Sequence, residues 1–191
     1  MWNVDTLKPV VEAVLFAAHR PLGLKDLQEL LPDVSRELLK RVLAALMEEY
    51  NSKERGIALV EVASGYRFQT KAQYKSWVMK ANKNMPRRLS RAALETLAIV
   101  AYKQPVTKAE IEQIRGVDVS AVLRQLIEKN LIRIAGRKDV PGKPLLYGTT
   151  KRFLEVFQLN SLADLPKPHE LDQSVQQDLF KKDEPKVSEA S

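Results

Sequence analysis

The sequence predicts a mainly helical protein with small β-hairpins, an α+β chain built from two tandem winged helix-turn-helix units. Residues 89–147 show three helical patterns followed by two short strand patterns around a loop. Residues 5–70 show the same order of patterns. One constant shift in residue number superimposes the two regions, as an internal repeat would require. We therefore expect one unit in residues 1–80 and a second in residues 90–166.

The second region has the clearest helix signals. Ser90 can cap a helix that runs to about Tyr102, and Pro105 then interrupts the chain because proline has no backbone N–H. Thr107 opens the next helix. Glu110, three residues later, completes a capping box in which each side chain accepts from a free backbone N–H of the other residue.

Gly116 is suited to the left-handed end of this second helix. The third helix has apolar residues at the spacing that places them on one buried face. Strands are expected at Leu131–Gly136 and Leu145–Tyr147, on either side of a long loop tip, Lys138–Pro144. The apolar residues of the third helix are Val119, Val122, Leu123, Leu126 and Ile127.

The first region repeats this order. Its helices are expected from Asp5 or Thr6 to about Ala18, over 24–31, and from a cap at Asp33 or Ser35 to about Tyr50. A strand at Ile57–Ala63, a turn at Ser64–Gly65 and an alternating strand after it complete a short hairpin.

The repeat can be checked position by position. Adding 84 to a residue number pairs turn, cap and apolar positions of the two regions, and after the hairpins the shift becomes 80. The pairs include Phe16 with Val100, Pro21 with Pro105, Asp26 with Glu110, Leu27 with Ile111, and Leu30 with Ile114.

The segments outside the two units differ in composition. Residues 81–89 form a basic, proline-containing linker. Thr149 or Thr150 is expected to cap a further helix, and residues 161–165 one more turn. Residues 167–191 are acidic and poor in apolar side chains, so we expect a disordered tail.

The overall composition is that of a soluble globular protein. The 191 residues include no Cys, which excludes disulfides and thiolate zinc sites. No apolar run is long enough to span a membrane, and the N-terminus does not resemble a signal peptide, so we expect a cytoplasmic protein. Residues 1–166 hold 27 basic and 18 acidic groups, a net charge of +9. That charge fits either nucleic-acid attraction or an ordinary basic protein.

Catalytic and cofactor motifs are not found in the sequence. The histidines, His19 and His169, have no matching set of metal ligands. Gly142-Lys143 is similar to part of a phosphate loop, but Arg137 and Pro144 stand where that motif needs Gly and Ser or Thr. We therefore expect no enzyme activity, no metal and no cofactor.

The charge of the helices separates two possible functions. Residues 107–130 carry four basic and four acidic groups, whereas a helix that enters a DNA groove normally carries excess positive charge. The second loop tip is basic, so a weak backbone contact there stays open. Tyr102 and Tyr147 fit either a protein partner or packing inside the unit.

The region from about Leu89 to Pro166 resembles the segregation and condensation protein B family of bacteria. The first half resembles it more loosely, through VEAVLFAAHRPL and GYRFQT. The phrases most specific to the family are Ala101–Pro105 (AYKQP), Ile114–Val117 (IRGV), Gly136–Lys138 (GRK) and Tyr147–Thr150 (YGTT).

This resemblance implies a non-enzymatic tandem winged-helix protein of the nucleoid. Such proteins form homodimers through the N-terminal unit. They bind a kleisin subunit of the segregation and condensation protein A type, and through it an SMC ATPase, in chromosome condensation and segregation. The alternative is a tandem winged-helix transcription regulator that reads DNA.

The second unit is the expected kleisin-binding part of the chain. Tyr102 lies at a helix end, where a ring can be half covered and its hydroxyl wet. The neutral third helix leaves its outer face free for an amphipathic partner segment. The candidate contact residues are Tyr102, Arg124, Lys129, Lys138 and Tyr147.

Overall fold

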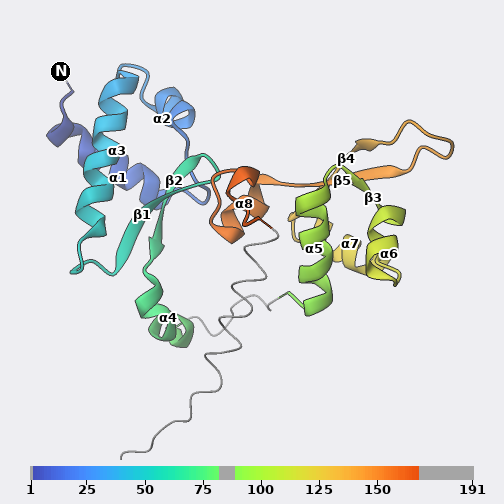
Figure 1. Cartoon of the computed structure of the whole chain (residues 1–191). Helices are drawn as coiled ribbons and strands as arrows, with labels where there is room; N and C mark the ends of the chain where they lie inside the picture. The colour runs from blue at the N-terminus through green and yellow to red at the C-terminus, as the bar shows by residue number, and fades with distance from the viewer. Residues whose placement is uncertain (1, 82–88, 168–191) are drawn as a thin grey trace, which may run out of the picture.

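A computed structural model of the chain describes residues 2–81 and 89–167. Two winged-helix units lie side by side in it, joined through a long strand and a small helix that sits between them (Figure 1). Most of the expected linker and nearly all of the expected acidic tail fall outside the described residues.

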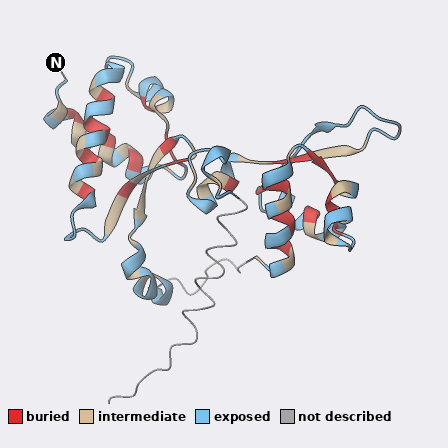
Figure 2. Cartoon of the chain, viewed as in Figure 1, coloured by how far each residue is buried: buried red, intermediate tan, exposed pale blue. Residues whose placement is uncertain are grey.

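The first unit contains a three-helix layer and a two-stranded hairpin. Its core is formed by apolar side chains of α1 and α3, with Leu27 of α2 and Leu59 of β1 (Figure 2). The elements are α1 Val4–Ala17, α2 Leu24–Leu30, α3 Arg36–Asn51, β1 Ile57–Val62, β2 Gly65–Thr70, a 3-10 turn Ala72–Tyr74, and α4 Lys75–Ala81.

The second unit repeats the plan with a separate core, in which Leu97, Ile111 and Leu126 are almost fully buried. Its hairpin loop is long and extends away from the helices (Figure 1). The elements are α5 Arg91–Lys103, β3 Val106–Thr107, α6 Lys108–Arg115, α7 Ser120–Glu128, β4 Ile132–Arg137, β5 Leu145–Thr149, α8 Lys151–Phe157, and a 3-10 turn Leu162–Asp164.

The helix ends confirm the capping signals of the sequence. The Ser90 hydroxyl accepts from Ala93 N at the start of α5. Thr107 and Glu110 form the expected capping box, with Thr107 N donating to Glu110 Oε2 at 2.8 Å. Gly116 ends α6 with φ of +69°, where its missing Cβ avoids the strain of the left-handed conformation.

Each unit contains a third strand position that the sequence did not predict. In the second unit β3 pairs antiparallel with β5, through Val106 and Tyr147. In the first unit Leu22 forms the matching bridge with Tyr66, and the two residues exchange backbone hydrogen bonds of 3.0 and 2.9 Å. Leu22 and Val106 are 84 residues apart, so this bridge strengthens the repeat.

Three local expectations were wrong. α1 begins at Val4 because Asn3, rather than Asp5 or Thr6, is the N-cap. The first hairpin turns at Ala63-Ser64, because β2 already begins at Gly65. The pairing of Phe16 with Val100 also fails, since Phe16 is 74% exposed and Val100 is fully buried. The helices α1 and α5 therefore do not match at a shift of 84 residues. The helices α2 and α6 do match at that shift.

Candidate interaction surfaces

The outer face of α1 is a largely apolar surface, bordered by the exposed carboxylate of Asp5, on a helix whose opposite face forms the core. Leu7, Val11 and Leu15 point inward and are at most 2% exposed. Two of the charged side chains of the helix are held against α3: Lys8 by Glu49 at 2.9 Å, and Glu12 by the Tyr50 hydroxyl. We define the α1 face as the exposed residues Trp2, Thr6, Pro9, Ala13, Phe16 and Ala17.

A hollow of about 340 Å³ lies beside Phe16, between the end of α1 and the hairpin. Its apolar lining includes Leu15, Ile57 and Phe68. The Phe68 ring packs edge-on against Tyr50 at 4.8 Å, which fixes the floor of the hollow. The large exposed ring of Phe16 thus stands beside a depression lined by apolar side chains and by polar ones such as Arg20, Arg67 and Gln69.

The second unit has a groove of about 310 Å³ on the outer side of α7. Leu123, Ile127 and Tyr147 provide its apolar lining, and Ile127 is 37% exposed. Lys108 and Arg124 stand at its rim. We call this the α7 groove.

The two cations at the rim of the α7 groove differ, because one is paired with carboxylates of the described residues and the other is not. Lys108 binds Asp118 at 3.0 Å and Glu112 at 3.3 Å, and the hydrogen bond that its ammonium donates to Asp118 is the main reason that the pKa of Lys108 is raised. Within residues 2–81 and 89–167, Arg124 makes no hydrogen bond or ion pair. Its guanidinium is therefore the available cation beside the apolar lining.

Tyr102 lies apart from this groove, at the end of α5. Its ring is 40% exposed, and its hydroxyl donates to the Pro166 carbonyl at 2.6 Å. The expected half-covered ring is present, but its hydroxyl contacts the chain segment that follows α8. A partner at Tyr102 would have to share the ring with that segment.

Lys138 and Lys129 occupy two further places. Lys138 binds Glu110 Oε1 at 2.7 Å across the root of the second loop tip. This bond and the two Thr107 donors lower the pKa of Glu110 from 4.5 to about 2. Lys129 is the exposed residue that ends α7.

The structure brings together only part of the expected contact set. Arg124 and Tyr147 line one groove, with Lys129 at the end of the same helix. Tyr102 and Lys138 lie elsewhere. Tyr147 is only 9% exposed and belongs to the core cluster. A partner could therefore contact only an edge of its ring.

Gln104 has a structural role that sequence patterns did not reveal. Its side chain accepts from Thr149 N at 2.8 Å, and its Nε2 donates to Thr149 Oγ1 at 3.0 Å. A Cβ at Gly148 would lie 3.0 Å from the Gln104 side-chain oxygen, so glycine gives room for this contact. Two of the family-specific phrases, AYKQP and YGTT, thus meet in space.

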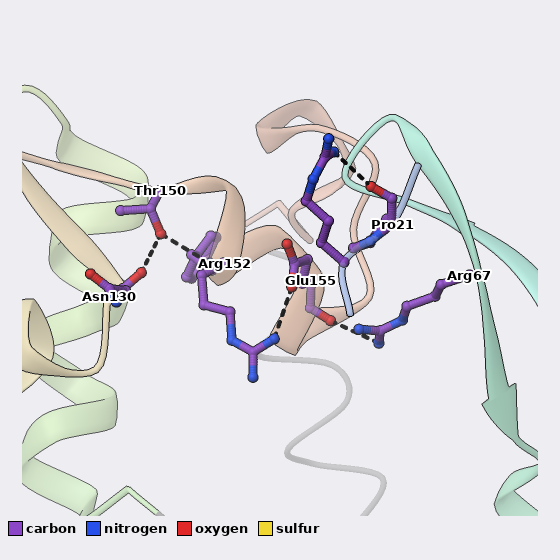
Figure 3. Close-up of polar contacts among 8 residues, drawn as sticks. Pro21, Arg67, Asn130, Thr150, Arg152 and Glu155 are labelled. Atoms are coloured by element: carbon purple, nitrogen blue, oxygen red, sulfur yellow. Dashed lines mark hydrogen bonds and ion pairs between the residues drawn. The ribbon is translucent and has the colours of Figure 1, made fainter. Parts of the chain in front are cut away.

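The sequence also missed a contact between the two units. The segment that ends α8 meets the first hairpin, where Arg67 donates to the Glu155 carbonyl at 3.2 Å (Figure 3). Ala63 N donates to the Leu159 carbonyl at 2.8 Å. No sequence signal predicts a pairing between residues about ninety positions apart.

Comparison with known proteins identifies the family. The model of the family described as segregation and condensation complex subunit ScpB matches residues 9–168. The chain belongs to this family. The ScpB match covers both winged-helix units and ends where the acidic tail begins.

Individual ScpB relatives agree with this assignment. A segregation and condensation protein B of Syntrophotalea carbinolica is 51% identical over 160 residues, covering 84% of this chain and 81% of its own. The crystal structure of ScpB from Mycobacterium tuberculosis is 34% identical and covers 82% of this chain and 98% of its own, with a TM-score of 0.40. A ScpB N-terminal domain, solved as a dimer complexed with ScpA peptide, is 33% identical over 41% of this chain and 96% of its own, with a TM-score of 0.39.

Metal binding and membrane insertion would require suitable side-chain clusters or helices among the described residues. Among them, no group of three or more His, Cys, Asp or Glu side chains could hold a metal ion. Likewise, none of the helices in residues 2–81 and 89–167 has the length and apolar content needed to cross a bilayer.

Proposed function

We propose that the chain is a non-enzymatic subunit of a bacterial condensin-like SMC–kleisin complex, associated with the nucleoid. It acts as a homodimer and binds the kleisin, through which it reaches the SMC ATPase. The observation that carries this proposal is the ScpB family match over residues 9–168, on a chain with two open apolar surfaces. Those surfaces lie on different units, so two partners can be bound at once.

The first unit, residues 1–80, supplies the dimer contact through the α1 face. A helix that is apolar on nearly all sides is normally buried, and here one side is left open. Small side chains at Thr6, Ala13 and Ala17 allow a second helix to approach closely, and Phe16 adds a large ring. The same patch on both copies gives a closed two-fold contact.

The second unit, residues 90–166, binds the kleisin through the α7 groove. An amphipathic segment would place its apolar side chains on Leu123, Ile127 and the Tyr147 edge. An acidic residue of that segment would pair with Arg124, which has no partner among the described residues. Lys129 extends this rim, while Tyr102 and Lys138 are secondary contacts of a longer partner.

The alternative function is a DNA-reading transcription regulator. The exposed second loop tip, with Arg137, Lys138 and Lys143, is the feature that favours it. However, Lys138 is paired with Glu110 at 2.7 Å, and α6 and α7 carry as many acidic as basic groups with their flanking residues. Any contact of the chain with DNA is therefore weak or indirect.

The proposal is tested by calorimetric titration of the full chain with its kleisin. Ile127→Ala should weaken binding at least about tenfold, because truncating an apolar anchor of the contact costs about 2 kcal/mol. Tyr102→Ala, at a secondary contact, should weaken binding measurably but less. Arg124→Ala should weaken binding less, and Lys40→Ala on α3 serves as the exposed control.

Circular dichroism must show that each variant stays folded. If Tyr102→Ala unfolds the second unit, Tyr102 is a core residue and is withdrawn as a contact. If both apolar variants fold and bind normally, the kleisin docks elsewhere and the α7 groove is wrong.

A further inference from the structure

The helix α8 is anchored in the second unit by one of its sides. Thr150 caps it by accepting from Phe153 N at 3.3 Å, and the same hydroxyl donates to the Asn130 carbonyl at the end of α7 (Figure 3). The Phe153 ring is 3% exposed and packs within the second core. The position of α8 is therefore set by the fold of the second unit.

The other side of α8 faces the first unit. One carbonyl in the last turn of α8 and two carbonyls of the segment after it meet three donors of the first hairpin. Arg67 donates to Glu155 O at 3.2 Å and Ala63 N to Leu159 O at 2.8 Å, as already described. The Ser64 hydroxyl donates to the Asn160 carbonyl at 3.4 Å. The Glu155 carbonyl also accepts from Gln158 N at 3.4 Å, so the first hairpin adds a second donor there and supplies the donors for the two later carbonyls.

The side chains around this contact have complementary charges. Arg20 and Asp26 of the first unit form an ion pair of 2.6 Å. Lys151 and Glu155 of α8 line the same cleft of about 90 Å³. Asp26 is paired with Arg20, and Glu155 with Arg152 at 2.8 Å, each within its own unit. Across the boundary the charges attract at longer range, Arg20 towards Glu155 and Lys151 towards Asp26.

The hairpin turn at this contact has an unusual conformation. Ala63 and Ser64 both have positive φ, at +53° and +60°, which usually requires glycine or asparagine. Left-handed conformations cost non-glycine residues about 1 kcal/mol or more each. The two-residue turn between the paired strands requires this conformation, and the hydrogen bonds of both residues to the segment after α8 help to stabilise it.

We propose that α8 and residues 158–160 form an intramolecular latch, seated on the turn of the first hairpin, that holds the two units in one orientation. Four kinds of observation support it: the anchored Phe153, the three backbone acceptors, the complementary charges and the strained turn. The latch fixes the direction of the α7 groove relative to the α1 face. It also occupies the tip of the first hairpin, which a winged helix would otherwise present to DNA.

The chain contains no Cys, so introduced cysteines report on the latch without background. The full-length double variant Ser64→Cys/Asn160→Cys should be joined within one chain by a short bismaleimide. The control pair, Ser64→Cys/Asp139→Cys, places its second thiol on the distant second loop tip and should stay unjoined (Figure 1). An interchain product instead would mean that α8 seats on a second copy, which overturns the intramolecular latch.

A second measurement does not depend on cross-linking. Spin labels on Lys40→Cys and Arg124→Cys, one in each unit, in chains diluted with an excess of unlabelled chain so that each dimer holds one labelled copy, should give a single narrow distance distribution. Adding Arg67→Ala should broaden it, whereas adding Arg133→Ala, which alters an exposed β4 residue, should not. A distribution that is already broad without these substitutions, or that Arg67→Ala leaves narrow, would overturn the latch.

Discussion

Leu15 and Phe16 are neighbours on α1 with different roles. Substituting each by alanine distinguishes a side chain needed for folding from one needed for dimer assembly. Leu15 is 2% exposed and lies in the core of the first unit. Phe16 is 74% exposed on the α1 face. In a single chain, Leu15→Ala should therefore be costly and Phe16→Ala nearly neutral.

The magnitudes follow from burial. Leu15→Ala should lower the free energy of unfolding by about 2–5 kcal/mol, since it leaves a cavity in a packed core. Phe16→Ala should change the unfolding free energy of the monomer by less than about 0.5 kcal/mol. A two-fold dimer contains Phe16 twice, so the substitution removes two rings from the contact. At about 2 kcal/mol for each ring, the dissociation constant of the dimer should rise about a thousandfold.

Sedimentation velocity over a concentration series gives the dissociation constant, and thermal unfolding of the monomer at low concentration gives the stability. Glu37→Ala, in the first turn of α3 after the Ser35 cap, provides an exposed control. The reasoning fails if Phe16→Ala unfolds the unit, or if it remains as dimeric as the unsubstituted chain.

Three further predictions concern the second unit and the tail. Gly116→Ala should destabilise the chain by about 1 kcal/mol through the left-handed backbone alone, because no atom lies within 4 Å of the added Cβ; chemical denaturation measures it. The pKa of Glu110 is lowered from 4.5 to about 2, so its ionised form stabilises the fold above about pH 4.5, and this small, screened contribution is lost as the pH falls towards 2. Glu110→Gln should remove that part of the pH dependence of thermal unfolding, and a pH profile that the substitution leaves unchanged would refute the assignment. Deleting residues 172–191 should leave both the melting temperature and kleisin binding unchanged, and a loss of either would show that the tail docks on the body.

Local chemistry explains which parts of the fold could be predicted. Ser90, the Thr107 and Glu110 pair and Gly116 act within one helical turn, so their roles are readable from spacing alone. The buried stripe of α7 follows in the same way, except that Ile127, expected on the buried face, is 37% exposed. The rotation of α1 could not be read, because this helix is apolar on two sides and its sequence does not say which side faces the core.

The candidate surfaces were less predictable for a physical reason. Tyr102 and Tyr147 look equivalent in the sequence, yet one is 40% exposed and the other 9%. Their difference depends on β3 and β5 pairing and on the segment at Pro166, which are contacts between distant positions. The contact of α8 with the first hairpin is likewise a property of the assembled chain.

The central claim is that the chain serves a condensin-like complex by binding a kleisin and that its contact with DNA is weak or indirect. Titrating the full-length chain in parallel with the kleisin and with a random DNA duplex, at near-physiological salt, tests it most directly. Our account predicts saturable kleisin binding by a dimer and little retention of the duplex. Tight duplex binding without kleisin binding would contradict it.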